Sequence, residues 1–389
     1  MFRRRWSGLP ADPVFPSNLE ELGYFVNEVD EIRSRDDPDC YFKYFLTKNA
    51  RWNDRQRFSF NEAIANIVAS RLEAESLNKV LLPLGTTDPA APHVKIGVSS
   101  DIDKKSRVVL IFGESAQEFG ILAHRVAGGP GGIDQGSMVS LVRALKNQTS
   151  SPADASPPGI ILANPGELWW WPQGKRGLTP TQRHSIPMSS AVHLGVYHDE
   201  TNNSIPENRS PAEHVRHTFE KVVPALVPAA AKLDIIAVGD LADDVETFLD
   251  DEKVWAEVGG RLSSMTLLGG FYNAAESKFA GFKTFVNDRA RAYMIHDHPL
   301  DMLVAGPYGN PKITGHTSYG CPVYSTGPDT VVTETMLITA RDAVVNWIQE
   351  VANTPEYKNP TVEVFIDDSC DDKQEGWEST SWGPDEGEK

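Results

Sequence analysis

Residues 233–249 (LDIIAVGDLADDVETFL) have the pattern of a buried strand that turns sharply into a helix. The run before the turn is apolar and suits a parallel strand, and apolar residues recur at helical spacing after it. A turn of this kind exposes the residue at its apex, and hydrolytic enzymes place a Ser, Cys or Asp nucleophile there. This chain offers Gly239 or Asp240 and no serine.

The spacing of the turn allows two alternatives for the apex. Gly239 takes the nucleophile position if Ala242 is the small residue that completes the motif, and Asp240 takes it if Val238 begins the motif. Only Asp240 could attack a substrate, as a carboxylate that forms an ester intermediate. Hydrolysis of that intermediate requires a histidine to activate water and an acid to orient the histidine.

Residues that could fill these two roles lie late in the chain: His298, His316, Asp297 and Asp301. The loop at 325–335, before the last expected helix, contains no histidine, so a serine-type triad is not expected. His296 and His298 have a His-x-His spacing that a metal could use, but no third ligand stands near them in the sequence. We therefore expect no metal and no other cofactor.

Glu114 and Ser115 follow an apolar run at 107–112, where hydrolases place the loop that stabilises the oxyanion. Ser115 as a nucleophile is a second catalytic alternative, and a serine that forms a turn or caps a helix is the simpler interpretation. Both residues are candidates for a binding site at the elbow.

Three consecutive tryptophans, Trp169, Trp170 and Trp171, are followed by Lys175 and Arg176. Two interpretations stay open. The indoles either cover one end of a sheet or form an aromatic and basic surface that binds a partner or a stacked base.

The elements that must position these residues alternate between strands and helices. Expected strands lie at 80–84, 93–98, 107–112, 159–163, 233–238, 262–268, 293–296 and 320–324, with an edge strand at 362–366. Expected helices lie at 55–77, 137–146, 212–226, 240–249, 282–293 and 335–351, and the glycine-rich stretch 127–137 is expected to be a flexible loop. This order predicts an α/β fold with a mostly parallel sheet, helices on both faces, and 108–112, 160–162 and 235–238 as adjacent central strands.

Composition limits the function. The 389 residues carry a formal net charge of −17, which would repel a polyanion, so direct nonspecific binding of nucleic acid is not expected. Three scattered cysteines favour free thiols in a reducing compartment. No signal-peptide or membrane-spanning pattern is present, so we expect no membrane association and a location in the nucleus, the cytoplasm or both.

The expected organisation is an N-terminal arm (1–14), one α/β-hydrolase-like domain (15–366) with an irregular cap insertion (164–209), and an acidic, disordered tail (367–389). Eight segments carry a family resemblance: FPSNLEELGYFVNE (15–28), RWNDRQR (51–57), VVLIFGES (108–115), GIILANPGE (159–167), SPAEHVRHTFE (210–220), the elbow, PLD (299–301) and CPVYSTG (321–327). With these segments the chain resembles the Argonaute-binding-protein domain family. That family includes fungal silencing-complex proteins, the C-terminal domain of class II histone deacetylases and related cotranscriptional regulators.

The resemblance implies an α/β-hydrolase-like fold and a role in small-RNA or heterochromatin silencing. Some members of that family retain a serine at the elbow and a histidine in the late loop, whereas this chain has Gly239 or Asp240 and Thr333 at those places. The implied function is a non-catalytic scaffold that binds a protein partner, such as Argonaute or a chromatin-silencing factor. A hydrolase that uses Asp240 or Ser115 on an ester or epoxide is the alternative.

Overall fold

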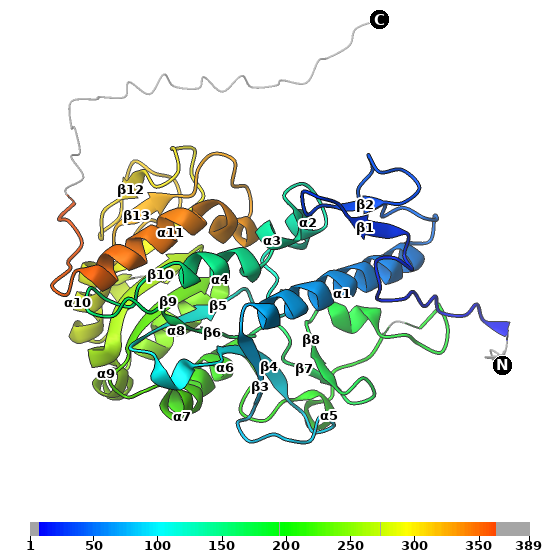
Figure 1. Cartoon of the computed structure of the whole chain (residues 1–389), viewed down its shortest axis with the longest axis horizontal. Coiled ribbons are helices and arrows are strands. Elements are labelled where there is room, and N and C mark those ends of the chain that lie inside the picture. The colour runs from blue at the N-terminus through cyan, green and yellow to red at the C-terminus, as the bar shows by residue number, and fades with distance from the viewer. Residues whose placement is uncertain (1–7, 194, 273, 363–389) are drawn as a thin grey trace, which may run out of the picture.

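A computed structural model describes residues 8–193, 195–272 and 274–362 of the chain (Figure 1). Within these residues, one sheet of nine strands runs through the centre of the molecule. In spatial order the strands are β12 (Leu303–Ala305), β13 (Val323–Ser325), β11 (Ala290–Met294), β10 (Leu262–Leu268), β9 (Lys232–Val238), β5 (Arg107–Phe112), β6 (Gly159–Leu162), β4 (Val94–Ser99) and β3 (Leu77–Leu82). The six strands from β13 to β6 are parallel, and antiparallel pairing brings in β12 at one edge and β4 and β3 at the other.

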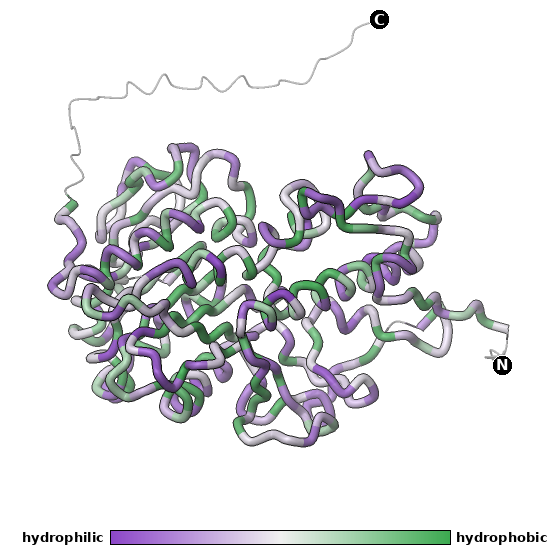
Figure 2. The backbone as a smooth tube through the Cα atoms, viewed as in Figure 1, coloured by the Kyte–Doolittle hydropathy of each residue, from purple (hydrophilic) through white to green (hydrophobic). Residues whose placement is uncertain are grey.

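The three strands predicted to be central neighbours are confirmed. β5 lies between β9 and β6, and all three are shielded from water except for Lys232 at the start of β9. Their continuous apolar runs follow from this position, because both faces of a central parallel strand are covered. Figure 2 shows hydrophobic residues concentrated along these central strands.

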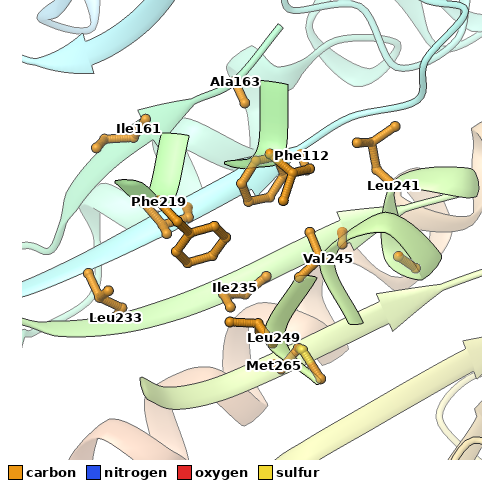
Figure 3. Close-up of a cluster of buried hydrophobic side chains, with 14 of the residues drawn as sticks. Phe112, Ile161, Ala163, Phe219, Leu233, Ile235, Leu241, Val245, Leu249 and Met265 are labelled. Carbon is orange, nitrogen blue, oxygen red and sulfur yellow. The ribbon is translucent and has the colours of Figure 1, made fainter. Parts of the chain in front are cut away.

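Helices cover both faces of the sheet and build one core on each. One face carries α6 (Pro211–His217), α7 (Val223–Leu226), α8 (Asp240–Leu249), α9 (Glu252–Val258) and α10 (Ala280–Arg289). The other carries α1 (Ala50–Ala74), α4 (Met138–Lys146) and α11 (Met336–Asn353). Alternate residues of the strands divide between the two cores, and Figure 3 shows Phe112, Ile235 and Met265 meeting Val245 and Leu249 of α8. The predicted α/β class is thereby confirmed.

The glycine-rich stretch 127–137 is not the flexible loop that we expected. It lies around the short helices α2 (His124–Ala127) and α3 (Gly132–Gln135), and it is tightly packed. A Cβ atom on Gly136 would lie 2.2 Å from the backbone nitrogen of Ala127, and one on Gly132 would lie 2.4 Å from the carbonyl oxygen of Asp30. The glycines therefore allow close contact between backbones, a role that composition does not separate from flexibility.

Three predictions near the C-terminal edge of the sheet are wrong in their bounds. The helix expected at 282–293 ends at Arg289, and the next strand is Ala290–Met294 instead of 293–296, because its first residues ARA are equally good helix formers. The strand expected at 320–324 is Val323–Ser325, and β12, which was not predicted, lies outside it. Of the edge strand expected at 362–366 only Val362 is described, and the tail 367–389 lies outside the described residues.

Smaller elements were also missed. Two antiparallel hairpins pair β1 (Tyr24–Val26) with β2 (Ile32–Ser34) and β7 (Trp169–Trp171) with β8 (Arg176–Leu178). The second hairpin and the short helix α5 (Glu200–Asn203) belong to the predicted cap at 164–209. The helix expected at 212–226 is α6, a π-helical turn at Thr218–Val222 and α7 in succession. Among the described residues, no helix has the length and apolar character needed to cross a membrane.

The described part of the predicted N-terminal arm is tied to the domain by a buried ion cluster. The Asp12 carboxylate accepts hydrogen bonds from Arg51 Nε at 2.5 Å, Arg55 Nη2 at 2.6 Å and the Met188 N–H at 2.7 Å. Burial opposes ionisation, but these bonds outweigh it and lower the pKa of Asp12 to about 2. Asp12 therefore joins α1 to the segment around Met188.

We expect Asp12→Asn to destabilise the protein at pH 7 and to remove part of its acid sensitivity. The folded pKa of about 2 lies below the ordinary value of 3.8, so the stabilisation is complete above about pH 4 and is lost as the pH falls toward 2. The shift corresponds to about 2 kcal/mol of unfolding free energy at pH 7, and urea unfolding should show that roughly half of it is lost by pH 3. Asp36→Asn, at an exposed carboxylate, is the control. Equal pH dependence in wild type and Asp12→Asn would contradict the assignment.

Candidate functional site

The elbow at the end of β9 has the backbone of a nucleophile turn, and its apex is a glycine. Gly239 has φ 63° and ψ −138°, in the left-handed range that favours glycine, and Asp240 is the first residue of α8. The Gly239 N–H donates to the Leu268 carbonyl at 2.8 Å, which fixes the apex against β10. The geometry therefore favours Gly239 at the nucleophile position, with Asp240 exposed beside it.

Glu114 occupies the space in front of the apex. A Cβ atom on Gly239 would lie 3.3 Å from Glu114 Cγ and 3.4 Å from Glu114 Oε1. Burial raises the pKa of Glu114 to about 7, and the nearby charges of Glu334 and Asp240 act in the same direction. Near neutral pH this carboxyl is therefore divided between its two protonation states.

The late loop returns to the elbow without a histidine. Thr333 lies over the residue after β10, because a Cβ atom on Gly269 would be 2.6 Å from Thr333 Cγ2. Its neighbour Glu334 accepts a hydrogen bond from Gln117 Nε2 at 2.9 Å and pairs with Arg125. The loop thus contributes a carboxylate held by two donors, and the general base that the chemistry needs is missing from it.

His316 and Asp301, two of the residues proposed for catalysis, are hydrogen-bonded away from the elbow. His316 lies with Nε2 at 3.1 Å from the Tyr272 carbonyl, and its ring packs on Tyr319. The His298 ring packs edge-on against His296, with 4.2 Å between the ring centres, and its Nδ1 has no hydrogen-bond partner among the described residues. Asp301 accepts a hydrogen bond from the Tyr293 hydroxyl at 3.2 Å, and Asp297 is exposed. Across the described ranges, none of these side chains is hydrogen-bonded or ion-paired to Asp240.

Ser115 stands in the turn that follows β5 and is partly buried. It lines a pocket of about 290 Å³ together with residues of the predicted cap, among them Trp169, His198 and Arg209. Glu114 and Ser115 are thus adjacent in sequence, but Glu114 lies at the elbow apex, whereas Ser115 faces the predicted cap.

The tryptophan run is mostly internal. Trp169 is buried and donates from Nε1 to His198 Nδ1 at 3.0 Å, and Trp170 is buried in the main core against His93. Trp171 is half-buried, with the Arg176 guanidinium 5.7 Å from its ring centre. This burial matches the covering role, and it leaves Trp171 as the member of the run available to a partner.

Sequence reasoning missed two buried polar side chains, Glu246 and His214. Glu246 follows Ala242 by four residues and precedes Leu249 by three, so it lies on the apolar face of α8. That spacing was the signal that could have found it. Over the described part of the chain, no group of three or more His, Cys, Asp or Glu side chains is arranged to hold a metal ion.

The fold and the elbow define an α/β-hydrolase-like protein whose nucleophile position is a glycine. The family model of the Arb2 domain, the Argonaute-binding protein 2 domain, matches residues 15–300, and the chain belongs to this family. The comparison with curated proteins gives no match.

Two of the solved structures that this chain is similar to are hydrolytic enzymes of low sequence identity. A dienelactone hydrolase-like promiscuous phosphotriesterase from metagenomic libraries is 12% identical, with 70% of this chain and 97% of that chain covered and a TM-score of 0.32. A glucuronoyl esterase from Solibacter usitatus is 11% identical, with 90% and 100% covered and a TM-score of 0.31.

Proposed function

We propose that this protein is a non-catalytic interaction module that serves small-RNA or heterochromatin silencing by binding a protein partner. The observation that carries the proposal is the elbow, where Gly239 has the nucleophile backbone and Glu114 fills the space that a reactive side chain would use. Membership of the Arb2 domain family supports a link to Argonaute. The protein acts in the nucleus, the cytoplasm or both.

The charge of the chain supports a protein partner over bare nucleic acid. A net charge of −17 repels phosphate backbones, whereas it attracts a basic protein surface. The elbow adds local negative charge, because Asp240 is exposed and lies near Glu114. The partner-binding surface therefore includes the elbow, with Trp171 as a second candidate.

The test is quantitative co-purification of the full chain from its native cells. We expect Argonaute or a chromatin-silencing factor with the wild type and a loss of at least about tenfold with Asp240→Lys, Trp171→Ala or both. Asp36→Lys, which reverses an exposed charge on another surface, is the control. Trp170 is unsuitable because its side chain is buried in the core. If silencing factors never co-purify with the wild type, the pathway is wrong.

We expect Gly239→Ser to create no hydrolase, although it restores a serine at the elbow. Among the described residues, no histidine is hydrogen-bonded to Gly239 or Asp240, so the new serine would have no general base. A non-glycine residue at φ 63° and ψ −138° also costs about 1–3 kcal/mol of stability. Thermal unfolding should show that loss, and p-nitrophenyl ester hydrolysis should stay at background. Ester or epoxide hydrolysis by the wild type that disappears in Asp240→Asn would instead establish the enzyme alternative.

A further inference from the structure

A second pocket lies on the face of the sheet that α8 and α10 cover, and none of the elbow residues Gly239, Asp240 and Glu114 lines it. Its volume is about 430 Å³, which is enough for a small molecule. Its wall includes the aromatic side chains of Tyr272, Phe282, Tyr308 and Tyr319 and the carboxyl of Glu246. Tyr308 and Lys283 are exposed at the rim.

Glu246 is an unpartnered carboxyl on the wall of this pocket. Its side chain belongs to α8 and the residue is 0% exposed. Neither Oε1 nor Oε2 has a hydrogen-bond partner among the described residues. A buried carboxyl without a partner is costly, and in a native protein it calls for a ligand or a partner that satisfies it.

The donors around Glu246 are already used by its acidic neighbours. Asp250 accepts hydrogen bonds from the Tyr272 hydroxyl at 2.7 Å and from the Ser277 hydroxyl at 2.9 Å, and two backbone N–H groups add to these. Asp243 accepts from the N–H groups that follow β10, at 2.7 and 2.8 Å. The carboxylates of Asp243 and Asp250 are thus hydrogen-bonded, and none of these donors bonds to Glu246.

These three acids and the aromatic wall favour a positively charged ligand. Burial, and after it the charges of Asp243 and Asp250, raise the pKa of Glu246 well above its ordinary value, and neither of its oxygens has a partner among the described residues. Aromatic rings such as Tyr272, Tyr319 and Phe282 attract cations through their faces. The nearest lysine on the pocket wall, Lys283, is exposed.

We infer that this pocket binds a small organic ammonium ion, which donates a hydrogen bond to Glu246 and packs its apolar body against Tyr272, Tyr319 and Phe282. A bound ammonium favours the ionised form of Glu246, so the Glu246 O–H bond breaks and its proton passes to the buffer. The site is separate from the elbow, so binding here and partner binding can be lost independently.

The probe is benzylamine at pH 7, and its neutral counterpart is benzyl alcohol. Titration calorimetry with the full chain should give a Kd on the order of 1 mM for the amine, and at least about tenfold weaker binding for the alcohol. Glu246→Gln keeps the shape of the side chain and should weaken amine binding at least about tenfold. Glu252→Gln, at an exposed carboxylate of α9, should bind the amine like the wild type.

A second measurement needs no variant. Titrations of the wild type in two buffers of different ionisation enthalpy should show release of close to one proton for each benzylamine bound, because the protonated Glu246 loses its proton. Equal affinity for the alcohol, undiminished binding by folded Glu246→Gln, or absence of saturable amine binding and proton release would each overturn the inference.

Discussion

Replacing Arg107 with methionine is expected to lower the free energy of unfolding by about 3–5 kcal/mol. Arg107 begins β5 and donates from Nε to Asp234 Oδ2 at 2.5 Å, while the Ser264 hydroxyl donates to the other carboxylate oxygen at 2.6 Å. Arg107 is 1% exposed and Asp234 is 0% exposed. The substitution leaves a buried carboxylate without its cation, which is the most costly way to break such a pair.

Arg107 also joins the sheet to α11 and to the segment that follows α4 through hydrogen bonds to backbone carbonyls. Nη1 donates to the Thr149 carbonyl at 3.0 Å, and Nη2 donates to the Ile348 carbonyl of α11 at 3.1 Å. Removal of both partners in Arg107→Met/Asp234→Leu should therefore recover much of the lost stability but not all of it. Urea unfolding of the single and double variants measures the difference.

The control is an exposed ion pair of the same type. Arg35 pairs with Glu20 at 2.7 Å, and both side chains are largely in water. Arg35→Met should change the unfolding free energy by less than about 1 kcal/mol. A similarly small loss for Arg107→Met would show that the buried pair does not stabilise the fold.

The sequence predicted the strands that contain this ion pair but not the pair itself. The apolar runs at 107–112 and 233–238 predicted β5 and β9, because burial on both faces requires such runs. Arg107 and Asp234 are 127 residues apart, and nothing local in either segment indicates the other. Pairing of this kind is set by strand order, which periodicity does not encode.

The candidate site, too, could be predicted only in part from the sequence. The elbow could be predicted, since a strand, a sharp turn and a helix are consecutive in the chain. Whether Gly239 or Asp240 is the apex residue depended on the backbone dihedral angles, and in the structure Gly239 has the angles of the apex. The burial of Trp170 and the position of Glu114 over the apex depend on segments that come from elsewhere in the chain, so composition alone left both open.

Replacing His214 with phenylalanine is expected to cost about 2–4 kcal/mol, because it leaves two buried polar groups without partners. His214 Nε2 accepts the Asn164 N–H at 3.1 Å, and Nδ1 lies 2.7 Å from Asn208 Oδ1, which requires the proton on Nδ1. Asn164 and His214 belong to two of the segments that carry the family resemblance. The histidine thus joins the end of β6 to α6 as a neutral donor and acceptor.

The ionisation of His214 separates this role from simple packing. Burial, with a smaller effect of the charge of His217, lowers the pKa of His214 to about 3 in the folded protein, against an ordinary value of 6.5. Between these values the unfolded chain binds a proton that the folded protein excludes, so stability falls as the pH drops below about 6.5. The difference amounts to about 2 kcal/mol between pH 7 and pH 5.

His214→Gln keeps one acceptor and one donor but does not titrate, so it should lose less stability at pH 7 than His214→Phe. Its unfolding free energy should fall by about 2 kcal/mol less than that of the wild type between pH 7 and pH 5. Other groups that titrate in this range, including Glu114 and His217, are present in both proteins, so the difference isolates His214. His184→Gln, at an exposed histidine, should leave the pH dependence unchanged. If the stability of His214→Gln depends on pH as that of the wild type does, the histidine is charged in the folded protein. A charged imidazole carries a proton on Nε2 and cannot accept the Asn164 N–H, so this hydrogen bond would not hold the two segments together.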